Sequence, residues 1–272
     1  MMWIIGIALF LILLAVLYVL STRSKKAGPQ IRKLRPYAYA HRGLHNHARP
    51  ENSLSAFRAA KAAGYGVELD VQLLKDGTLA VFHDFTLDRI TGQPGKLEEL
   101  SAEDLWKYPL SGSNEHIPTF REVLDLFDGK VPLIVELKAS GKNHAALAEA
   151  TCNMLDSYQG LYCVESFDPR CLVWMKKNRP DVVRGQLTEN FFKTPSSKLP
   201  GILKFCLTHQ MFNFITQPDF VAYRHTDRKC LSNGLIKKLW GTARVAWTIK
   251  DPADYKAVKK EGWIPIFENF EP

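Results

Sequence analysis

The sequence predicts an α/β barrel preceded by one membrane-spanning helix. From Tyr37 onward, short apolar segments typical of strands alternate with amphipathic helical patterns, which favours βα units around a parallel sheet. The first twenty residues form a separate apolar run. The 272-residue length accommodates one large domain, and the hydrophobic fraction of 46% and charged fraction of 24% are ordinary for a globular protein.

Residues 1–21 are expected to be a transmembrane anchor. Between Met1 and Leu20 only Gly6 interrupts the apolar side chains. At 1.5 Å per residue the run reaches about 30 Å, the thickness of a bilayer's hydrocarbon core. A cleaved secretory signal normally begins with positive charge and ends in an A-x-A-like site, and neither is present. A helix of this length in a soluble core would normally carry a polar stripe. We therefore favour the anchor.

Residues 22–36 are expected to form a basic juxtamembrane linker that contains a helix-breaking Ala27-Gly28-Pro29. It carries a cluster of cations: Arg23, Lys25, Lys26, Arg32, Lys33 and Arg35. The positive-inside rule places such a cluster on the cytoplasmic side, so we expect a single-pass protein whose main domain (residues 37–272) is cytoplasmic. The cluster would also attract anionic lipid headgroups, although a solubilising stop-transfer flank explains it equally well.

The net charge of +8 is partly local to this junction. The remaining cations are spread out and no recognition motif accompanies them, so the sequence does not indicate nucleic-acid binding. The cysteines are odd in number and lack C-x-x-C spacing; they are Cys152, Cys163, Cys171, Cys206 and Cys230. They are typical of small buried side chains in a reducing compartment, and neither a disulfide framework nor a zinc site is expected.

Nine strands are expected in the main domain, at residues 37–40, 67–74, 79–83, 132–138, 161–167, 182–187, 214–217, 244–249 and 264–267. Helices are expected at 54–64, 119–127, 144–157, 169–178, 196–210, 231–240 and 252–261. Asn52-Ser53 supplies an N-cap for the first helix, and Asp76-Gly77 predicts a two-residue hairpin. Because an eight-stranded barrel holds one strand fewer, one partner of this hairpin is expected to lie partly outside the barrel.

Polar residues fall at the ends of successive predicted strands. His41 and Arg42 follow the first strand, and His83 ends the third. Glu68 and Asp70 in the second strand are two residues apart and therefore point to the same face. In a barrel the carboxyl ends of the strands converge on one mouth, where active sites form.

Three carboxylates, Glu68, Asp70 and Glu136, would meet at this mouth. Burying them is costly unless a positive charge neutralises them. Their oxygen atoms are hard ligands of the kind that Mg²⁺ or Ca²⁺ prefers. The sequence therefore predicts a divalent-metal site without thiolate ligands.

The neighbouring residues fit chemistry at phosphorus. Arg42 and Lys138 are cations suited to non-bridging phosphate oxygens. His41 and His83 would supply the base and the acid that an in-line displacement requires. Taken singly, each has an ordinary explanation, because a lone histidine after a strand is usually structural and Arg42 could simply pair with a carboxylate. Glu68 and Asp70 could also face solvent on an edge strand. The common position of all these residues at strand ends favours a functional site over separate structural roles.

The order and spacing of these motifs resemble the glycerophosphodiester phosphodiesterase family. The matching segments are His41-Arg42-Gly43, Pro50-Glu51-Asn52-Ser53, Glu68-Leu69-Asp70-Val71, Lys75-Asp76-Gly77, Phe82-His83-Asp84, the run from Thr86 to Gly92, Ile117-Pro118-Thr119, Glu136-Leu137-Lys138, Ser166-Phe167 and Trp247-Thr248. The resemblance implies a TIM (β/α)8 barrel of the phosphatidylinositol-phospholipase-C-like type. It also implies hydrolysis of a phosphodiester to sn-glycerol 3-phosphate and an alcohol.

The resemblance also implies roles for individual residues. His41 and His83 match acid/base histidines, and Glu68, Asp70 and Glu136 match metal ligands. The substrate-contacting positions are Arg42 and Lys138 at the phosphate, Glu51 near Arg42 or the metal, and Trp247 lining the mouth.

The C-terminal segment departs from the family pattern. The family usually ends with Thr-Asp or Thr-Asn and a nearby proline after a short apolar strand, whereas here Phe267 is followed by Glu268-Asn269-Phe270. This departure concerns the rim of the pocket more than its centre. The aromatic-rich stretch 201–228 is interpreted mainly as packing, with an apolar surface for an acyl chain as the alternative.

The sequence thus predicts a membrane-anchored, metal-dependent glycerophosphodiester phosphodiesterase in which His41 is the base and His83 the acid, although the two assignments could be exchanged. One alternative is a lysophospholipase-D-like activity at the membrane. Another is a catalytically silent module that binds lipid headgroups. The choice between Mg²⁺ and Ca²⁺, between direct water attack and a cyclic intermediate, and the oligomeric state stay open.

Overall fold

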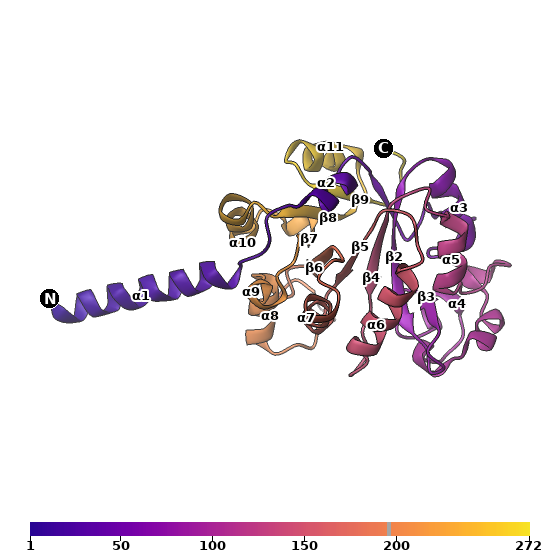
Figure 1. Cartoon of the computed structure of the whole chain (residues 1–272), viewed down its shortest axis with the longest axis horizontal. Coiled ribbons are helices and arrows are strands. Elements are labelled where there is room, and N and C mark those ends of the chain that lie inside the picture. The colour runs from indigo at the N-terminus through magenta and orange to yellow at the C-terminus, as the bar shows by residue number, and fades with distance from the viewer. Residues whose placement is uncertain (195–196) are drawn as a thin grey trace.

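The computed structural model describes residues 1–194 and 197–272, and eight parallel strands in it close a barrel (Figure 1). The ring runs β1, β2, β4, β5, β6, β7, β8 and β9, and β1 pairs in parallel with both β2 and β9. The strands are β1 Tyr39–His41, β2 Gly66–Leu73, β3 Leu79–Val81, β4 Leu133–Leu137, β5 Tyr162–Ser166, β6 Arg184–Thr188, β7 Phe220–Arg224, β8 Ala243–Ile249 and β9 Ile264–Phe267. The predicted TIM-barrel fold is confirmed.

The ninth strand, β3, lies outside the ring because it pairs antiparallel with β2 alone. Gly77, at the turn between them, has a φ of +85°, a conformation that glycine adopts without steric cost. The hairpin predicted at Asp76-Gly77 is present, and β3 is the extra strand. Its turn holds three residues (75–77) and not the expected two, because the Leu74 amide donates to the Thr78 carbonyl.

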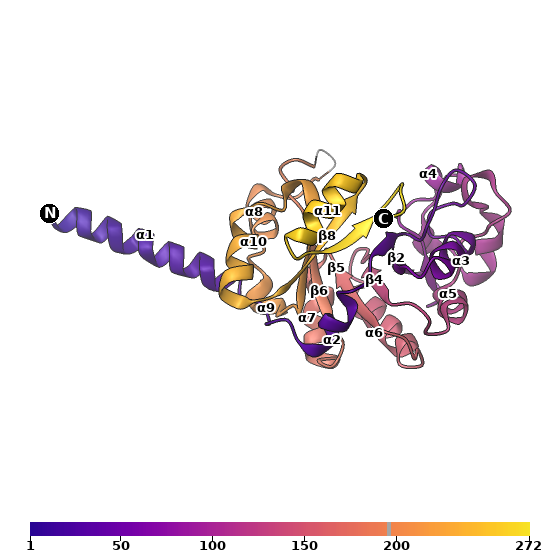
Figure 2. The same ribbon diagram turned by 90° about the horizontal axis from the view of Figure 1, so that it is seen from above.

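The structure contains helices α1 to α11, and all of them except α1 surround the barrel (Figures 1 and 2). They are α1 Met2–Ser21, α2 Pro29–Leu34, α3 Leu54–Ala62, α4 Asp88–Thr91, α5 Phe120–Phe127, α6 His144–Leu155, α7 Pro169–Asn178, α8 Gly201–Thr208, α9 Asn213–Thr216, α10 Leu231–Leu235 and α11 Pro252–Lys260, with short turns η1 Leu97–Glu99, η2 Ala102–Lys107, η3 Leu110–Gly112, η4 His225–Asp227 and the π-turn η5 Ile236–Trp240. Ser53 caps α3 by accepting a hydrogen bond from the Ala56 amide, as predicted. The helix predicted at 196–210 is observed from Gly201 to Thr208, and its expected first residue lies outside the described part of the chain.

One strand prediction was wrong. Residues 214–217 were expected to be a strand, but Asn213–Thr216 form α9, and the strand of this βα unit is β7 at Phe220–Arg224. A short apolar run does not by itself distinguish a strand from a helical turn. The first four residues of β7 are buried, as in a parallel strand covered on both faces, so the alternation that marks a half-exposed strand is missing.

The segment expected to be a linker is folded against the barrel. It contains α2, whose Ile31 and Leu34 are each only 2% exposed and pack with Tyr39 and Phe220 at the amino-terminal end of the barrel. The Tyr39 hydroxyl donates to the Leu34 carbonyl at 2.9 Å. Proline fits here because the first turn of a helix leaves its N–H groups unpaired. The Pro29 that was expected to break a helix therefore begins one.

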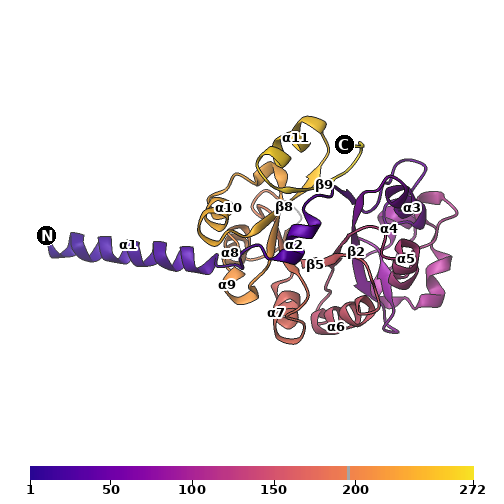
Figure 3. The ribbon, with the colours of Figure 1, turned by 45° about the horizontal axis from the view of Figure 1, so that its top comes forward.

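Helix α1 projects away from the barrel (Figures 1 to 3). It is long and apolar enough to cross a membrane, and no residue of it is buried against the described chain. All five cysteines are free, and Cys152, Cys163 and Cys171 are buried.

Candidate active site

The parallel register aligns the polar residues at the carboxyl ends of the strands. His41 of β1 is opposite Glu68 of β2, and Asp70 of β2 is opposite Glu136 of β4. Glu136 in turn is opposite Glu165 of β5. Side chains from four strands thus converge on one mouth, as expected for a barrel of this kind.

Glu68, Asp70 and Glu136 form a buried cluster whose ligand oxygens lie within 4.8 Å of one another. They are 2%, 1% and 7% exposed, respectively. The Lys138 Nζ lies 3.2 Å from Glu136 and 3.6 Å from Asp70. Within residues 1–194 and 197–272, Asp70 Oδ1 has no hydrogen-bond partner, although it is buried. A buried carboxylate oxygen that lacks a hydrogen bond within the described chain, close to two other carboxylates, fits a divalent cation with oxygen ligands.

The pKa values of the cluster show that its charge is incompletely neutralised. Burial and the repulsion of Asp70 and Glu136 raise the pKa of Glu68 well above its ordinary value. Burial also raises the pKa of Glu136, despite the attraction of Lys138. At Asp70 burial is outweighed by His83, Arg42 and Lys138, which hold its pKa below the ordinary value. A cation bound among the three would favour their charged forms.

Arg42 is held over the cluster by carboxylates on both sides. Its Nη1 donates to Glu51 Oε1 at 2.7 Å, and its Nε lies 3.4 Å from Asp70 Oδ2. Glu51 also accepts two hydrogen bonds from Arg89, at 2.8 and 2.9 Å. Burial opposes the charge of Glu51, but these two guanidinium groups lower its pKa to about 2. Asn52 donates to Asp70 at 2.9 Å, so this predicted cap residue also contacts the cluster.

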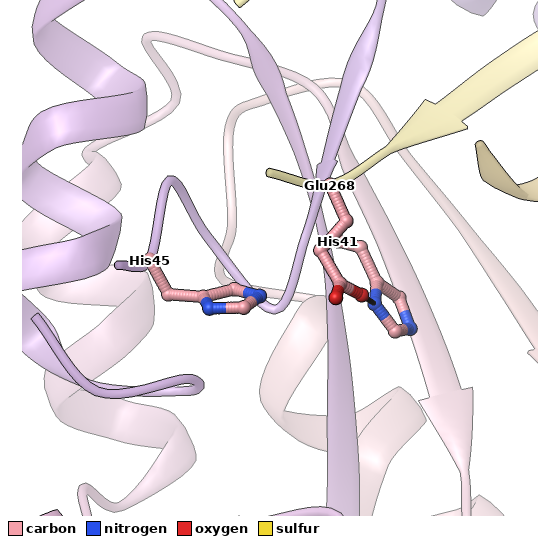
Figure 4. Close-up of side chains that lie close together, drawn as sticks. All are labelled: His41, His45 and Glu268. Carbon is pink, nitrogen blue, oxygen red and sulfur yellow. Dashed lines mark hydrogen bonds and ion pairs between the residues drawn. The ribbon is translucent and has the colours of Figure 1, made fainter. Parts of the chain in front are cut away.

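His41 is paired with Glu268 from the strand that closes the barrel. Figure 4 shows the two side chains together, with the His41 Nδ1 2.6 Å from Glu268 Oε2. With the proton of the neutral ring on Nδ1, Nε2 carries no proton. This Nε2 lies 3.8 Å from Glu68 Oε2. Burial lowers the pKa of His41 to about 4, against the opposing effect of Glu268. The imidazole is therefore neutral at pH 7 and can accept a proton.

His45 approaches the same pair from the loop after β1 (Figure 4). His41, His45 and Glu268 form a second group with ligand atoms within 4.8 Å of one another. Within this group His41 Nδ1 and Glu268 Oε2 are already hydrogen-bonded to each other, which leaves fewer free ligand atoms for a cation. The carboxylate cluster, in which Asp70 Oδ1 accepts no hydrogen bond from the described residues, is therefore the better candidate for a metal site.

His83 lies just after β3, with a carboxylate of its own. Its Nδ1 is 2.5 Å from Asp84 Oδ1, and Arg89 donates to Asp84 through Nε at 2.6 Å. Burial raises the pKa of Asp84, but the hydrogen bonds from His83 and Arg89 outweigh it and lower that pKa. Each histidine thus has a charged carboxylate on one ring nitrogen, and the other nitrogen remains for a substrate.

A small cavity of about 40 Å³ joins these groups, and Trp247 forms one of its walls. It is lined by His41, Arg42, Glu68, His83, Glu136, Glu165, Phe167, Leu187, Trp247 and Ile266. Trp247 packs edge-on against Phe167 with ring centroids 5.6 Å apart, and the Arg224 guanidinium lies 5.3 Å from its ring. The structure thus brings His41, His83, Arg42 and Trp247 to the carboxylate cluster, whereas Glu51 contacts Arg42 and does not line this cavity.

Two carboxylates at the mouth were not predicted from the sequence as site residues. Glu165 is only 1% exposed. Its burial, and to a smaller extent repulsion from Glu136 and Asp70, raises its pKa well above the ordinary value. A charged residue at the end of the apolar strand Cys163-Val164-Glu165 was the available signal. Glu268 was noticed only as part of a departure from the family pattern, and nothing local to its sequence indicates the contact with His41.

Comparisons with known proteins agree on one family. The model of the glycerophosphoryl diester phosphodiesterase family matches residues 41–270. A glycerophosphodiester phosphodiesterase of Caldanaerobacter subterraneus is 30% identical over 233 residues, covering 82% of this chain and 89% of the relative. A glycerophosphodiester phosphodiesterase of Bacillus altitudinis is 33% identical over 175 residues, covering 60% of this chain and 71% of the relative.

Solved structures share the fold. A phosphodiesterase of Oleispira antarctica, in complex with the product sn-glycerol 3-phosphate, superposes with a TM-score of 0.73 at 24% identity, covering 87% of this chain and 94% of that one. A glycerophosphodiester phosphodiesterase of Parabacteroides distasonis superposes with a TM-score of 0.67 at 21% identity, covering 86% of this chain and 92% of that one.

Proposed function

The chain belongs to the glycerophosphoryl diester phosphodiesterase family, and from this premise we propose that it hydrolyses glycerophosphodiesters to sn-glycerol 3-phosphate and an alcohol. The observation that carries the proposal is the placement of His41 and His83 around the three buried carboxylates. The Oleispira antarctica phosphodiesterase was solved with the same product that is expected here.

Glu68, Asp70 and Glu136 would hold a divalent cation, with Mg²⁺ and Ca²⁺ as the candidates because all ligands are oxygens. A bound cation would act as a Lewis acid toward the phosphoryl oxygens. Lys138 offsets the remaining charge of Asp70 and Glu136. Arg42, held by Glu51, would contact a non-bridging phosphate oxygen through Nη2.

His41 takes the proton of the attacking hydroxyl, because its buried ring is neutral at pH 7. Glu268 holds the Nδ1–H and stabilises the imidazolium that forms. His83, held by Asp84, protonates the leaving alkoxide. Trp247 and Phe167 form the apolar wall that orients the substrate.

An activity panel tests the proposal. The purified full chain is assayed with glycerophosphocholine and glycerophosphoethanolamine, each with EDTA, Mg²⁺ or Ca²⁺. Turnover that requires one of the metals and is lost in His41→Ala is expected. A chain that cleaves neither substrate, and whose His41→Ala variant binds headgroups as well as wild type, would instead be a silent binding module.

A second candidate substrate is a lysophospholipid. An apolar hollow of about 940 Å³ between α7, α8 and α9 is lined by Leu203, Leu207 and Phe212 and shares Phe167 with the catalytic cavity. An acyl chain would fit there because the lining is mainly apolar. Leu203→Gln should then reduce hydrolysis of lysophosphatidylcholine while leaving that of glycerophosphocholine unchanged. Equal effects on both substrates, or no effect on either, would reject the acyl site.

We further propose that residues 1–21 anchor the protein in a membrane and that the catalytic domain, residues 37–272, is cytoplasmic. The basic residues after α1 support this orientation. Residues 22–36 would then be a folded connection, because Thr22 and Ser24 are buried against the barrel. Protease protection of a C-terminal tag in sealed cells tests the orientation; a tag accessible from outside would reverse it.

A further inference from the structure

The connection between α1 and the barrel is built from specific contacts. The Tyr18 hydroxyl lies 3.1 Å from His209 Nδ1, at the end of α8. Trp240 Nε1 donates to Thr22 Oγ1 at 3.2 Å, and Ser24 Oγ lies 2.7 Å from Thr242 Oγ1. Lys25 pairs with Asp219 at 3.2 Å. These contacts join the end of α1 and the residues after it to one side of the barrel.

The side of the barrel next to α1 is formed by α8, α9, α10 and η5. All three views place α8, α9 and α10 beside the end of α1, whereas α3, α4 and α5 lie at the opposite end (Figures 1 to 3). The turn η5 belongs to the same side because its Trp240 donates a hydrogen bond to Thr22. Phe205 of α8 packs against His209, with ring centroids 4.5 Å apart, and His209 contacts Tyr18. We name this side the α8–α10 face.

The α8–α10 face exposes large apolar side chains. They are Ile202, Phe205, Phe214, Ile215, Leu231 and Leu239, of which Ile202 is 73% exposed and Phe214 50% exposed. Single exposed apolar residues are ordinary, but a group of them on neighbouring short helices marks a surface that is covered by something.

The charge of the face indicates what covers it. The sequence contains no Asp or Glu from residue 190 to 218, or from 228 to 250. The same elements carry Lys204, Lys237 and Lys238. Apolar side chains with flanking lysines and no carboxylate match the interfacial region of an anionic bilayer, where aromatic residues and lysines are favoured.

We propose that the α8–α10 face lies in the headgroup region of the membrane that α1 spans, so that the barrel rests on the bilayer along one side. This inference rests on α1 as a membrane span and is independent of the substrate. A barrel docked in this way keeps α8 and the apolar hollow beneath it at the lipid surface, and leaves α3 to α5 in solvent.

Photolabelling of the full chain tests the docking. The protein is reconstituted in vesicles of phosphatidylcholine and phosphatidylglycerol that contain phosphatidylcholine with a diazirine in its acyl chain, and labelled peptides are identified by mass spectrometry. Labelling of residues 201–216 and 231–240 is expected to be severalfold above that of residues 97–112, which include the 69%-exposed Trp106 of η2. Without phosphatidylglycerol the labelling should fall, and equal labelling would overturn the role of the lysines.

Exposed side chains allow matched variants that should fold normally. Phe214→Ser combined with Leu239→Ser should reduce labelling of the unaltered α8 peptide severalfold, whereas Trp106→Ser should leave it unchanged. Labelling of α1 alone would overturn the docking, as would cross-links between the α8–α10 faces of two copies. Absence of label from α1 as well would overturn the anchor and the docking together, without bearing on the hydrolytic activity.

Discussion

The Nδ1 of His41 lies 2.6 Å from Oε2 of Glu268, across the seam where β9 pairs with β1 to close the barrel. Lys250 lies 2.9 Å from the other oxygen of Glu268. The hydrogen bonds from His41 and Lys250 outweigh the effect of burial and keep the pKa of Glu268 low. A charged carboxylate therefore orients the proposed base, and the barrel must close for the pair to form.

Glu268→Gln should lower kcat about 10- to 100-fold with little change in KM, because the amide retains an acceptor but no longer stabilises the imidazolium. Glu268 raises the pKa of His41, so its loss should also move the acidic limb of the pH–rate profile to lower pH. Glu271→Gln, at an exposed position nearby, is the matched control. Wild-type kcat and an unchanged pH profile in Glu268→Gln would remove the positioning role.

His41→Ala and His83→Ala should each reduce kcat about 10²- to 10⁴-fold, the usual contribution of a general acid or base. Both variants should retain the wild-type circular dichroism spectrum and metal affinity. His116→Ala is the control, because His116 stacks on Trp106 and does not line the catalytic cavity. Activity in either site variant that matches that of His116→Ala would reject the two-histidine mechanism.

Metal binding should be visible as stability in the absence of substrate. A cation at about 100 times its Kd adds about 2.7 kcal/mol to the free energy of unfolding, so Tm should rise with Mg²⁺ or Ca²⁺ and fall with EDTA. Asp70→Asn should abolish this response. Asp156→Asn, whose carboxylate is 56% exposed and paired with Arg179, should preserve it. A wild-type Tm that changes with neither metal would contradict the assignment of the three carboxylates as metal ligands.

Glu51 should make stability depend on pH in the acid range. Its pKa falls from 4.5 to about 2 in the folded chain, so the stabilisation is present above pH 4.5 and is lost as the pH falls toward 2. Glu51→Gln should therefore lower the free energy of unfolding by about 1–3 kcal/mol at pH 7, with the difference from wild type shrinking below pH 4.5. Urea unfolding at pH 7, 5 and 3 measures it. A difference that does not change with pH would mean that the charge of Glu51 contributes nothing.

The half of the site that lies near the start of the domain could be predicted because its residues share one sequence neighbourhood. Glu68 and Asp70 alternate on one strand, and His41 and His83 end or follow the strands beside it. Glu268 could not be predicted in the same way, because 227 residues separate it from His41 and only barrel closure brings them together.

The errors in the fold have physical causes. The strand predicted at 214–217 was wrong because apolar runs in α9 and β7 are short, adjacent and similar in composition. Helix α2 was predicted to be part of a linker because a helix of six residues has little stability of its own. It is stabilised by the packing of Ile31 and Leu34 against the amino-terminal end of the barrel. In both segments, tertiary packing determines the secondary structure.

The identity of the products distinguishes the proposed reaction from other phosphodiester cleavages. Glycerophosphocholine is incubated with the full chain and Mg²⁺ or Ca²⁺, and the phosphorus-containing product is identified by ³¹P NMR. We expect sn-glycerol 3-phosphate, with choline released, and no product in EDTA. Phosphocholine as the product, or equal turnover in EDTA, would overturn the proposed reaction.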